Sequence, residues 1–336
     1  MKALVYTDVE ELTYQDRPTP TPAPGEVLVR ILASGICGSD MHAFVGHDER
    51  RPAPLTLGHE AAGVVVGGAQ DGRRVTINPL VTCLECRDCK AGRENLCANR
   101  QIISMPPREG AFADFVCMPE RNLITVPEGV DLRKAALAEP IACGWHGARL
   151  ARGILGSDFT GLTCAVIGGG AIGVGAALSL RAQGATDITL IEPNALRRET
   201  LAGVDGFDVC APGDSGMPAK GTVDCVIDGV GYAATRASAS ALARAGGVIA
   251  HIGLGEASGG LDVRRMTLQE ITFIGTYTYT AQDFAETAAA IFGARLGALD
   301  WIETRPLCDG QRAFEDIRSG QVAAPKIVLI PEHATD

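Results

Sequence analysis

Short apolar or alternating runs, divided by Gly and Pro, dominate the first part of the chain. Runs of this kind predict β-strands, and a period of two indicates that one face is buried. The first part is therefore expected to be rich in β-structure, with strands at residues 2–7, 26–33, 61–66, 74–77, 113–118 and 123–126.

The pattern changes after Pro140, where mostly apolar runs alternate with helical stretches. Strands that are apolar on both faces are typical of a parallel sheet covered by helices on both sides. After about residue 297 the chain returns to short strands, and the pattern leaves open which domain this tail joins. The expected strands are 164–167, 188–191, 223–227, 247–252, 271–274, 301–307 and 326–330, with helices at 171–182 and 311–318.

Composition narrows the class of protein. A length of 336 residues allows two domains, and 41 glycines with only 5% aromatic residues suit an α/β enzyme. The net charge of −10 argues against a nucleic-acid partner, which calls for a basic surface. The N-terminal stretch has no export signal, and no apolar run reaches the roughly 18 residues that span a membrane. We therefore expect a cytoplasmic enzyme with no membrane partner.

A glycine-rich turn follows the first apolar run of the second part. Gly168, Gly170 and Gly173 form the pattern G-x-G-x-x-G between a strand and a helix, which is the context of a dinucleotide-binding motif. Gly168 allows the tight turn, Gly170 lets the main chain approach a pyrophosphate, and Gly173 lets the helix pack closely on the sheet. The amides of Ala171 and Ile172, at the start of the helix, are expected to face the phosphates.

Glu192 ends the next expected strand. A carboxylate at this place accepts hydrogen bonds from the adenosine ribose and repels the 2′-phosphate of NADP, so NAD is the expected cofactor. The alternative is a helix-capping glutamate in a Rossmann fold that binds no dinucleotide. Arg197 and Arg198 weaken the preference for NAD, because a nearby arginine can accommodate a 2′-phosphate.

Four cysteines, Cys83, Cys86, Cys89 and Cys97, have the spacing C-x2-C-x2-C-x7-C. Thiolates this close together can surround one tetrahedral zinc ion and leave no coordination position open. Disulfides are the alternative, and an intracellular chain disfavours them. The spacing therefore predicts a structural zinc that stabilises a loop and takes no part in catalysis.

Further potential ligands are scattered along the chain. Cys37 lies in GICGSDMH, His59 and Glu60 lie in LGHEAAG, and Glu139 lies in LAEPIACGWH. Taken singly, they also fit a buried thiol, a core histidine, a surface acid and a charge at a helix start. Together they gain weight, because a catalytic zinc needs three protein ligands and one open position.

These segments together resemble the zinc-containing medium-chain dehydrogenases, and among them the polyol branch with sorbitol and butanediol dehydrogenases. The matching pieces are GICGSDMH, GHEAAG, the four-cysteine lobe, EPIA, VIGGGAIG followed by Glu192, and PKIVL, in family order over about residues 26–330. The resemblance implies an α/β fold with a GroES-like catalytic domain at 1–143, including a structural zinc lobe at 79–100. It also implies a doubly wound Rossmann domain at 144–290 and a return of 291–336 to the catalytic domain.

The resemblance implies ligands for a catalytic zinc. Cys37 and His59 match two invariant ligands, and the third is either Glu60 or Glu139, since members of the branch use either. Cys143, four residues after Glu139, is interpreted as a structural thiol.

The resemblance also implies supporting roles near the zinc and the cofactor. Asp40 matches the carboxylate that orients the zinc histidine. Ser39 and His42 match the hydroxyl and the imidazole that carry the alcohol proton outward. Arg197 matches an arginine that packs on the adenosine in NAD-dependent members, which makes it compatible with NAD.

Two positions bear on the substrate. Thr278 stands where sorbitol dehydrogenases carry an arginine that holds polyol hydroxyls, which argues against sorbitol itself. Phe44 is expected on the pocket side of its segment, where it permits a partly apolar substrate.

The expected activity is zinc-dependent hydride transfer from a secondary alcohol or polyol to NAD⁺, giving a ketone. We expect two zinc ions per chain and a homo-oligomer, either a dimer or a tetramer. The alternatives are L-threonine 3-dehydrogenase-like oxidation of an amino alcohol, a zinc-free reductase of the same superfamily, and a non-catalytic relative of the fold. Cys37, His59 and the cysteine lobe argue against the zinc-free reductase, and the intact glycine motif argues against the non-catalytic relative.

Overall fold

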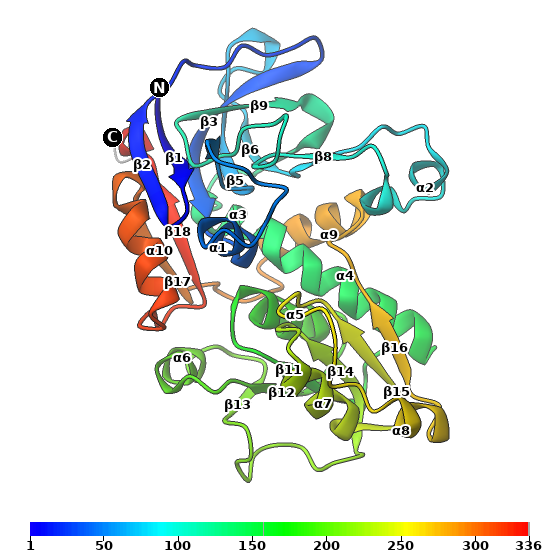
Figure 1. The fold of residues 1–336 in the computed structure, drawn as a ribbon. Helices are drawn as coiled ribbons and strands as arrows, with labels where there is room; N and C mark the ends of the chain where they lie inside the picture. The colour runs from blue at the N-terminus through cyan, green and yellow to red at the C-terminus, as the bar shows by residue number, and fades with distance from the viewer. Residues whose placement is uncertain (157, 335–336) are drawn as a thin grey trace.

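The computed structural model describes residues 1–156 and 158–334. They form a β-rich domain, which includes both the first and the last described strands, and a second domain built on a parallel sheet (Figure 1). The predicted fold class, a β-rich domain joined to a doubly wound parallel sheet, is confirmed. In these two stretches of chain, no helix is long and apolar enough to cross a membrane.

A seven-stranded sheet forms the centre of the β-rich domain, in the order β10-β6-β5-β3-β18-β17 with β9 paired to β3. Alternation builds it: in β3, Val29 and Ile31 are buried while Arg30 between them is exposed. A three-stranded sheet of β2, β1 and β4 and a two-stranded sheet of β7 and β8 complete the domain. The strands of the three sheets are β1 (Lys2–Asp8), β2 (Glu11–Asp16), β3 (Glu26–Gly35), β4 (Leu55–Thr56), β5 (Glu60–Val66), β6 (Arg74–Ile77), β7 (Leu80–Val81), β8 (Gln101–Ile102), β9 (Phe115–Pro119), β10 (Leu123–Thr125), β17 (Ile302–Pro306) and β18 (Lys326–Ile330).

The tail of the chain is part of this sheet. β18 pairs antiparallel with β3, so that Val328 lies opposite Gly35, and β17 pairs parallel with β18. Helix α10 (Gly310–Arg318) lies between these strands in sequence and places Phe314 against Phe44 and Phe112 in the core. The last strand therefore reaches the end of β3, just before Cys37.

The second domain has six parallel strands in the order β13-β12-β11-β14-β15-β16. This is the strand order of a Rossmann fold, whose ligands bind at the carboxyl ends of the strands. Its elements are β11 (Thr163–Ile167), α5 (Ala171–Ala182), β12 (Asp187–Ile191), α6 (Ala195–Leu201), β13 (Asp208–Cys210), β14 (Val223–Asp228), α7 (Ala233–Leu242), β15 (Ala243–His251), α8 (Val263–Leu268), β16 (Thr272–Gly275) and α9 (Ala281–Phe292).

The parallel strands are apolar throughout because both faces of the sheet are covered. In β11, Cys164 and Val166 belong to one core cluster, whereas Ala165 and Ile167 belong to another on the opposite face. This arrangement explains why the sequence shows runs of apolar residues here rather than alternation.

Helix α4 (Ala138–Leu155) connects the two domains. It is continuous through residues 143 and 144, where the sequence analysis places the domain boundary. Pro140 is tolerated because it lies in the first turn, where a main-chain N–H has no helical partner to lose. Gly144 lies so close to the backbone of Ala176 in α5 that a side chain there would overlap with it. Helices α4 and α5 therefore pack with their backbones in direct contact at Gly144.

A buried charge network ties α4 to α9. Asp283 is fully buried; its carboxylate lies 2.7 Å from His146 Nδ1 and 2.5 Å from Arg149 Nε, and it also accepts a hydrogen bond from the Thr280 hydroxyl. Burial opposes ionisation, but these partners outweigh it and hold the pKa of Asp283 well below its usual range.

Replacement Asp283→Asn tests this network through the pH dependence of stability. Because the pKa is lower in the folded state, the ionised carboxylate stabilises the fold above the unfolded value of about 3.9, and this stabilisation is lost as the pH falls below it. We expect the variant to be less stable than the unchanged protein at pH 7. The difference between their unfolding free energies should be about 1 kcal/mol smaller at pH 3 than at pH 7. Urea unfolding at both pH values measures the gap, and a gap independent of pH would contradict the network.

Candidate active site

The ends of two paired strands bring three potential ligands together. Cys37 follows β3, and Glu60, which pairs with Gly35, begins β5 directly after His59. One ligand atom from each of Cys37, His59 and Glu60 lies within 4.8 Å of the other two. A tetrahedral ion with bonds of about 2.0–2.3 Å can bridge such a group with small movements. Glu139 lies outside this group.

Asp40 holds two of these residues in place. It is fully buried in helix α1 (Gly38–Phe44), and its Oδ2 accepts a hydrogen bond of 3.0 Å from the main-chain N–H of Cys37. Its Oδ1 lies 3.5 Å from Nδ1 of His59. Burial disfavours its charge, but His59 and the hydrogen bonds lower the pKa of Asp40 below its usual range. The hydroxyl of Ser104, 3.3 Å from the same Nδ1, is a second partner of the ring.

Lys326, the first residue of β18, binds Glu60 in the interior. Its Nζ hydrogen-bonds Oε1 of Glu60 at 2.7 Å and the carbonyl of Ile36 at 2.6 Å. Nζ also forms an ion pair with Oε2 at 2.6 Å, although this contact does not have the geometry of a hydrogen bond. A side chain at Gly35 would overlap with the same oxygen, so only glycine leaves room for this carboxylate. Lys326 therefore contacts both oxygens of a carboxylate that lies next to Cys37 and His59.

Glu139 lies close to the group, at the start of α4. Its Oε1 accepts a hydrogen bond of 2.8 Å from the hydroxyl of Tyr279, which is fully buried. Burial raises the pKa of Glu139 to about 7, and Glu60 adds to the rise, whereas His59 and Tyr279 oppose it. Glu139 is thus held by Tyr279 and lies near Glu60, but it is not one of the three closely spaced donors, which are Cys37, His59 and Glu60.

The charges of this region fit a cation. Burial alone lowers the pKa of His59 and Lys326, yet nearby acids and the thiol of Cys37 raise both. The region therefore draws positive charge into the interior despite the cost of desolvation. A thiolate, an imidazole and a carboxylate form a donor set that suits zinc.

The other residues predicted near the zinc take different positions. Ser39 is half-buried and His42 is exposed on the same short helix, and in the described part of the chain no hydrogen bond joins their side chains. Cys143 is buried, with its sulfur 3.9 Å from the carbonyl of Glu139. The prediction that Phe44 lies on the pocket side of its segment is wrong. Its ring packs in the core against Phe314, with 5.2 Å between the ring centroids. It faces inward because the apolar side of this helix covers the core.

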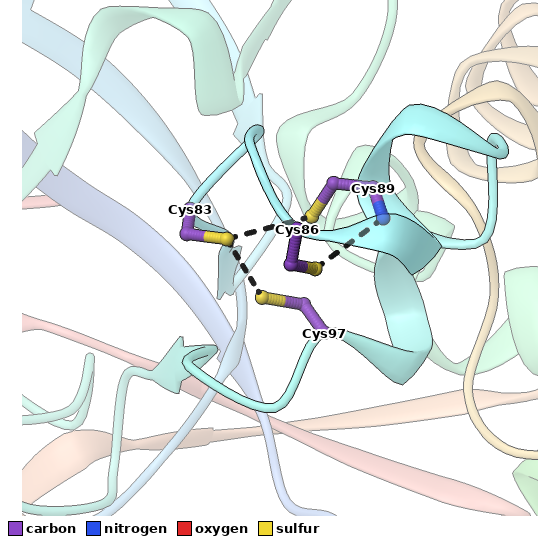
Figure 2. A group of neighbouring side chains, drawn as sticks. All are labelled: Cys83, Cys86, Cys89 and Cys97. Carbon is purple, nitrogen blue, oxygen red and sulfur yellow. Dashed lines mark hydrogen bonds between the residues drawn. The ribbon is translucent and has the colours of Figure 1, made fainter.

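The four-cysteine lobe gathers its sulfurs around one point (Figure 2). All four cysteines are free thiols; Cys83 Sγ lies 3.5 Å from Cys97 Sγ and 3.9 Å from Cys89 Sγ. Zn–S bonds of about 2.3 Å in a tetrahedron place sulfurs about 3.8 Å apart, so these separations fit a zinc ion. The lobe includes α2 (Arg87–Lys90) and the turn Glu94–Leu96, and projects from the β-rich domain (Figure 1).

The main chain of the lobe prepares the thiols for a cation. The N–H groups of Glu85 and Cys86 lower the pKa of Cys83 to about 6. Burial and the hydrogen bonds of Cys86 and Cys97 raise the pKa of Cys89 to about 12. One thiol ionises easily and another resists, which is expected where several thiolates share one small space and need a positive ion to balance them.

The glycine-rich turn has the geometry of a dinucleotide cradle. Gly168 has φ of +100°, and a side chain there would overlap with Val230. A side chain at Gly173 would overlap with the carbonyl of Gly168, so the helix packs directly on the turn. A side chain at Gly170 would meet nothing within 4 Å, which leaves the start of α5, with Ala171 and Ile172, open to a phosphate.

Glu192 closes this turn from the next strand. Its Oε2 accepts a hydrogen bond of 2.6 Å from the N–H of Gly169, and its Oε1 accepts one of 2.7 Å from Asn194. Arg198 donates to the carbonyls of Glu192 and Pro193, so it is engaged with the main chain. Arg197 lies 3.8 Å from the carboxylate of Glu192 and keeps a buried Nε without a partner in the described residues.

Three residues of the site were not anticipated. Lys326 lies in the segment PKIVL, and a charge beginning an apolar strand was the available indication. Tyr279 and Ser104 had no indication, because each reaches the cluster through a loop whose path the hydrophobic pattern does not define.

Comparison with known proteins gives the family. Residues 23–128 match the alcohol dehydrogenase GroES-like domain, and residues 171–293 match the zinc-binding dehydrogenase domain, which together cover more than half of the chain. The chain is 29% identical to L-galactonate-5-dehydrogenase of Escherichia coli over 89% of each chain. It is 36% identical to sorbitol dehydrogenase of Bacillus subtilis over 59% of this chain and 58% of that one.

A solved structure is similar over nearly the whole length. A zinc-binding dehydrogenase from Sinorhizobium meliloti, crystallised with NADP, superposes with a TM-score of 0.86 at 28% identity, over 98% of this chain and 99% of that one. The fold, the metal-binding donor sets and the glycine turn agree with these matches. The chain therefore belongs to the zinc-containing medium-chain dehydrogenases and is an NAD(P)-linked oxidoreductase that acts on alcohols or polyols.

Proposed function

We propose that this chain oxidises a secondary hydroxyl of a polyol to a ketone, with zinc held by Cys37, His59 and Glu60. The observation that supports this most is the group of three donor atoms within 4.8 Å at the ends of two paired strands. When bound, zinc supplies Lewis acidity toward the substrate hydroxyl and the nicotinamide accepts a hydride. A second zinc in the four-cysteine lobe is structural.

Protein groups fix the geometry of this centre. Asp40 holds the main chain of Cys37 and the ring of His59, so both donors keep their orientation. Lys326 fixes Glu60 by a hydrogen bond to Oε1 and an ion pair with Oε2. Glu139, held by the hydroxyl of Tyr279, remains a candidate to replace Glu60 as third ligand or to contact the substrate.

Ser39 and His42 form the proposed exit for the alcohol proton. They lie three residues apart on α1, which places them on neighbouring parts of one helix face. Ser39 is half-buried near Cys37 and His42 is exposed, so a proton passed between them moves from the interior to water. This order of burial supports the roles that the family resemblance implies.

The site favours NAD over NADP. Glu192 is buried and bound to the turn at Gly169, and a carboxylate at this position of the fold disfavours the 2′-phosphate of NADP, which supports the proposal. Arg198 is occupied by main-chain carbonyls, and we assign to Arg197, 3.8 Å from Glu192, the packing on the adenosine that the family resemblance implies. The expected homo-oligomer and the cytoplasmic location stay predictions.

Two relatives suggest the kind of substrate. One is named for L-galactonate, a polyol acid, and the other for sorbitol, a neutral polyol. Both carry rows of secondary hydroxyls, which supports polyol chemistry over simple alcohols. Thr278, in place of the arginine of sorbitol dehydrogenases, still argues against sorbitol as the preferred substrate.

A screen of dinucleotide reduction tests the proposal. The zinc-loaded chain is mixed with polyols, polyol acids, diols, secondary alcohols and L-threonine, with NAD⁺ or NADP⁺, and absorbance of the reduced cofactor is followed. We expect a polyol-class substrate to reduce NAD⁺ at least tenfold more efficiently than NADP⁺, and a strong chelator to stop the reaction. Reduction only with L-threonine, or full turnover after zinc removal, would contradict the proposal.

A further inference from the structure

The four-cysteine lobe contacts the segment that leads into helix α9. Asn95 donates a hydrogen bond of 2.8 Å from its side-chain amide to the carbonyl of Tyr277. Glu94 accepts a hydrogen bond from the main-chain N–H of Ala281, which is the first residue of α9 and has no partner for this N–H within the helix. Figure 1 shows the lobe next to this end of α9. These two bonds therefore join the β-rich domain to the parallel-sheet domain.

A third residue of the lobe covers the same segment. The guanidinium group of Arg100 lies over the ring of Tyr277, with 4.7 Å between Cζ and the ring centroid. Arg100 also donates to the carbonyl of Cys97 at 2.9 Å, and the N–H of Cys97 donates to the carbonyl of Glu94 at 3.0 Å. Cys97 carries one of the four sulfurs of the lobe. The contacts to Tyr277 and Ala281 are therefore connected, over a few bonds, to a residue of the proposed structural zinc site.

Tyr279 lies between Tyr277 and Ala281, the two positions that the lobe holds. Its ring is fully buried and packs against Phe284 of α9, with 5.5 Å between the ring centroids. Its hydroxyl donates a hydrogen bond of 2.8 Å to Oε1 of Glu139. Among the described residues, no other group hydrogen-bonds this carboxylate. The direction of the Glu139 carboxylate therefore depends on Tyr279.

Glu139 lies beside the donor group of the proposed active site. It belongs to the first turn of α4, and α4 packs against strand β5. Strand β5 begins with Glu60, one of the three closely spaced donors. Because Glu139 is only 6% exposed, water cannot readily replace a lost hydrogen-bond partner. A shift of the Tyr279 hydroxyl would therefore change how this buried carboxylate faces the donor group.

The backbone between the lobe contact and Tyr279 is strained. Thr278 has a φ of +48°, a conformation that β-branched residues rarely adopt. Such a conformation persists only where the surrounding structure imposes it. The bond from Asn95 lies on one side of Thr278, and the bond from Tyr279 to Glu139 lies on the other. Loss of the bond from Asn95 should let Thr278 relax and displace Tyr279.

We propose that the four-cysteine lobe positions Tyr279, which in turn holds Glu139 beside the donor group of the active site. Asn95 is the main positioning residue of the lobe, because it bonds the carbonyl directly before the strained residue Thr278. The inference rests on the proposed oxidation of an alcohol at the catalytic metal site. The lobe then has a role besides stability: it keeps a buried hydrogen bond of the active site formed, from across the boundary between the domains.

Kinetics of single and double variants test this series of contacts in the zinc-loaded, full-length chain, with the best substrate of the screen. Tyr279→Phe keeps the ring and removes the hydroxyl, and it should lower kcat about tenfold, as expected for one hydrogen bond to a charged group. Asn95→Ala should lower kcat about threefold. KM for NAD⁺ should stay unchanged in both variants, because the glycine turn is unchanged. The double variant should be no slower than Tyr279→Phe, since Asn95 acts through Tyr279.

Gln183→Ala is the matched control for Asn95→Ala. The side-chain amide of Gln183 donates to the carbonyl of Trp145 at 3.2 Å and so joins the end of α5 to α4. The control therefore loses the same kind of bond between two elements, away from the segment that contains Tyr279. It should lower stability to a similar extent as Asn95→Ala and leave kcat unchanged.

Hydrogen exchange, followed by mass spectrometry, reports on the segment without any turnover. Peptides that cover residues 277–281 should exchange at least about tenfold faster in Asn95→Ala than in the unchanged protein, and Gln183→Ala should not differ from it. When Cys37 and His59 are both replaced by alanine, the lobe is the remaining proposed metal site. In that variant, a chelator should speed exchange of the same peptides.

Unchanged kcat in Asn95→Ala, or a double variant in which the two losses simply multiply, would overturn the inference while the proposed function stands. Absence of turnover with every alcohol would overturn the proposed function, and hydrogen exchange would then decide on the lobe. Faster exchange of residues 277–281 in Asn95→Ala would support positioning by the lobe, and unchanged exchange would overturn it.

Discussion

Replacing Cys37 and His59 together by alanine is expected to lower turnover at least about a thousandfold and to remove one of two zinc ions per chain. Two of the three closely spaced donors are then missing, and Glu60 with its lysine partner cannot hold a divalent ion alone. The loss of Lewis acidity removes several kcal/mol of transition-state stabilisation, and about 4 kcal/mol corresponds to a thousandfold in rate. Initial rates and zinc analysis of the purified variant measure both effects.

Cys143→Ala is the matched control for this experiment. Cys143 is a buried thiol close enough to the cluster for Glu139 and Cys37 to act on it, since burial first and these groups second raise its pKa well above the usual range. Nothing places it among the three donors, so this variant should keep two zinc ions and most of its turnover. Equal zinc loss in the control, or full turnover in the double variant, would rule out the proposed ligand set.

Lys326→Met is expected to lower the unfolding free energy of the metal-free protein by about 3–5 kcal/mol. The variant leaves the carboxylate of Glu60 buried without its cationic partner and removes the hydrogen bond to the carbonyl of Ile36. Breaking a buried pair on one side is costly, because the remaining charge has neither water nor a counter-ion. Urea unfolding after treatment with chelator measures the loss, and addition of Glu60→Gln should recover part of it.

Lys134→Met provides the comparison with an ordinary surface pair. Lys134 lies 2.6 Å from Asp300, and the acid is 72% exposed, so the pair is screened by water. Its removal should change stability by about 0.5 kcal/mol or less. If the Lys326 and Lys134 variants lost equal stability, the buried pair would not have the structural role assigned to it.

Periodicity along the chain was enough to locate much of the fold. Helix α5 and strands β6 and β18 have the predicted bounds, because each is a short segment whose apolar pattern ends sharply. The extent of helix α4 was not predicted, although a helix start at Glu139 was considered, since its small and mixed residues give a weak periodicity and Pro140 in its first turn looks like a break.

The donor residues could be found in the sequence because their motifs are short and local. Cys37 lies just after β3, and His59 just before β5, so strand pairing alone brings them together. The partner of Glu60 could not be identified in the same way, because Lys326 lies 266 residues further along the chain. The choice between Glu60 and Glu139 as the neighbour of Cys37 and His59 therefore depends on contacts between distant parts of the chain, which the local sequence pattern does not show.

The position of Phe44 also depends on residues that are distant in the sequence. Its segment follows Cys37, which lies in the donor group with His59 and Glu60, whereas the side chain of Phe44 packs in the core. The rotation of a seven-residue helix depends on its neighbours, here Phe112 and Phe314, which lie far away in sequence.

Anomalous diffraction at the zinc edge from crystals of the intact, zinc-loaded chain addresses the ligand assignment most directly. The account predicts two peaks per chain, one among Cys37, His59 and Glu60 and one among the four cysteines of the lobe. A single peak in the lobe, with no metal between Cys37 and His59 at full zinc loading, would contradict it.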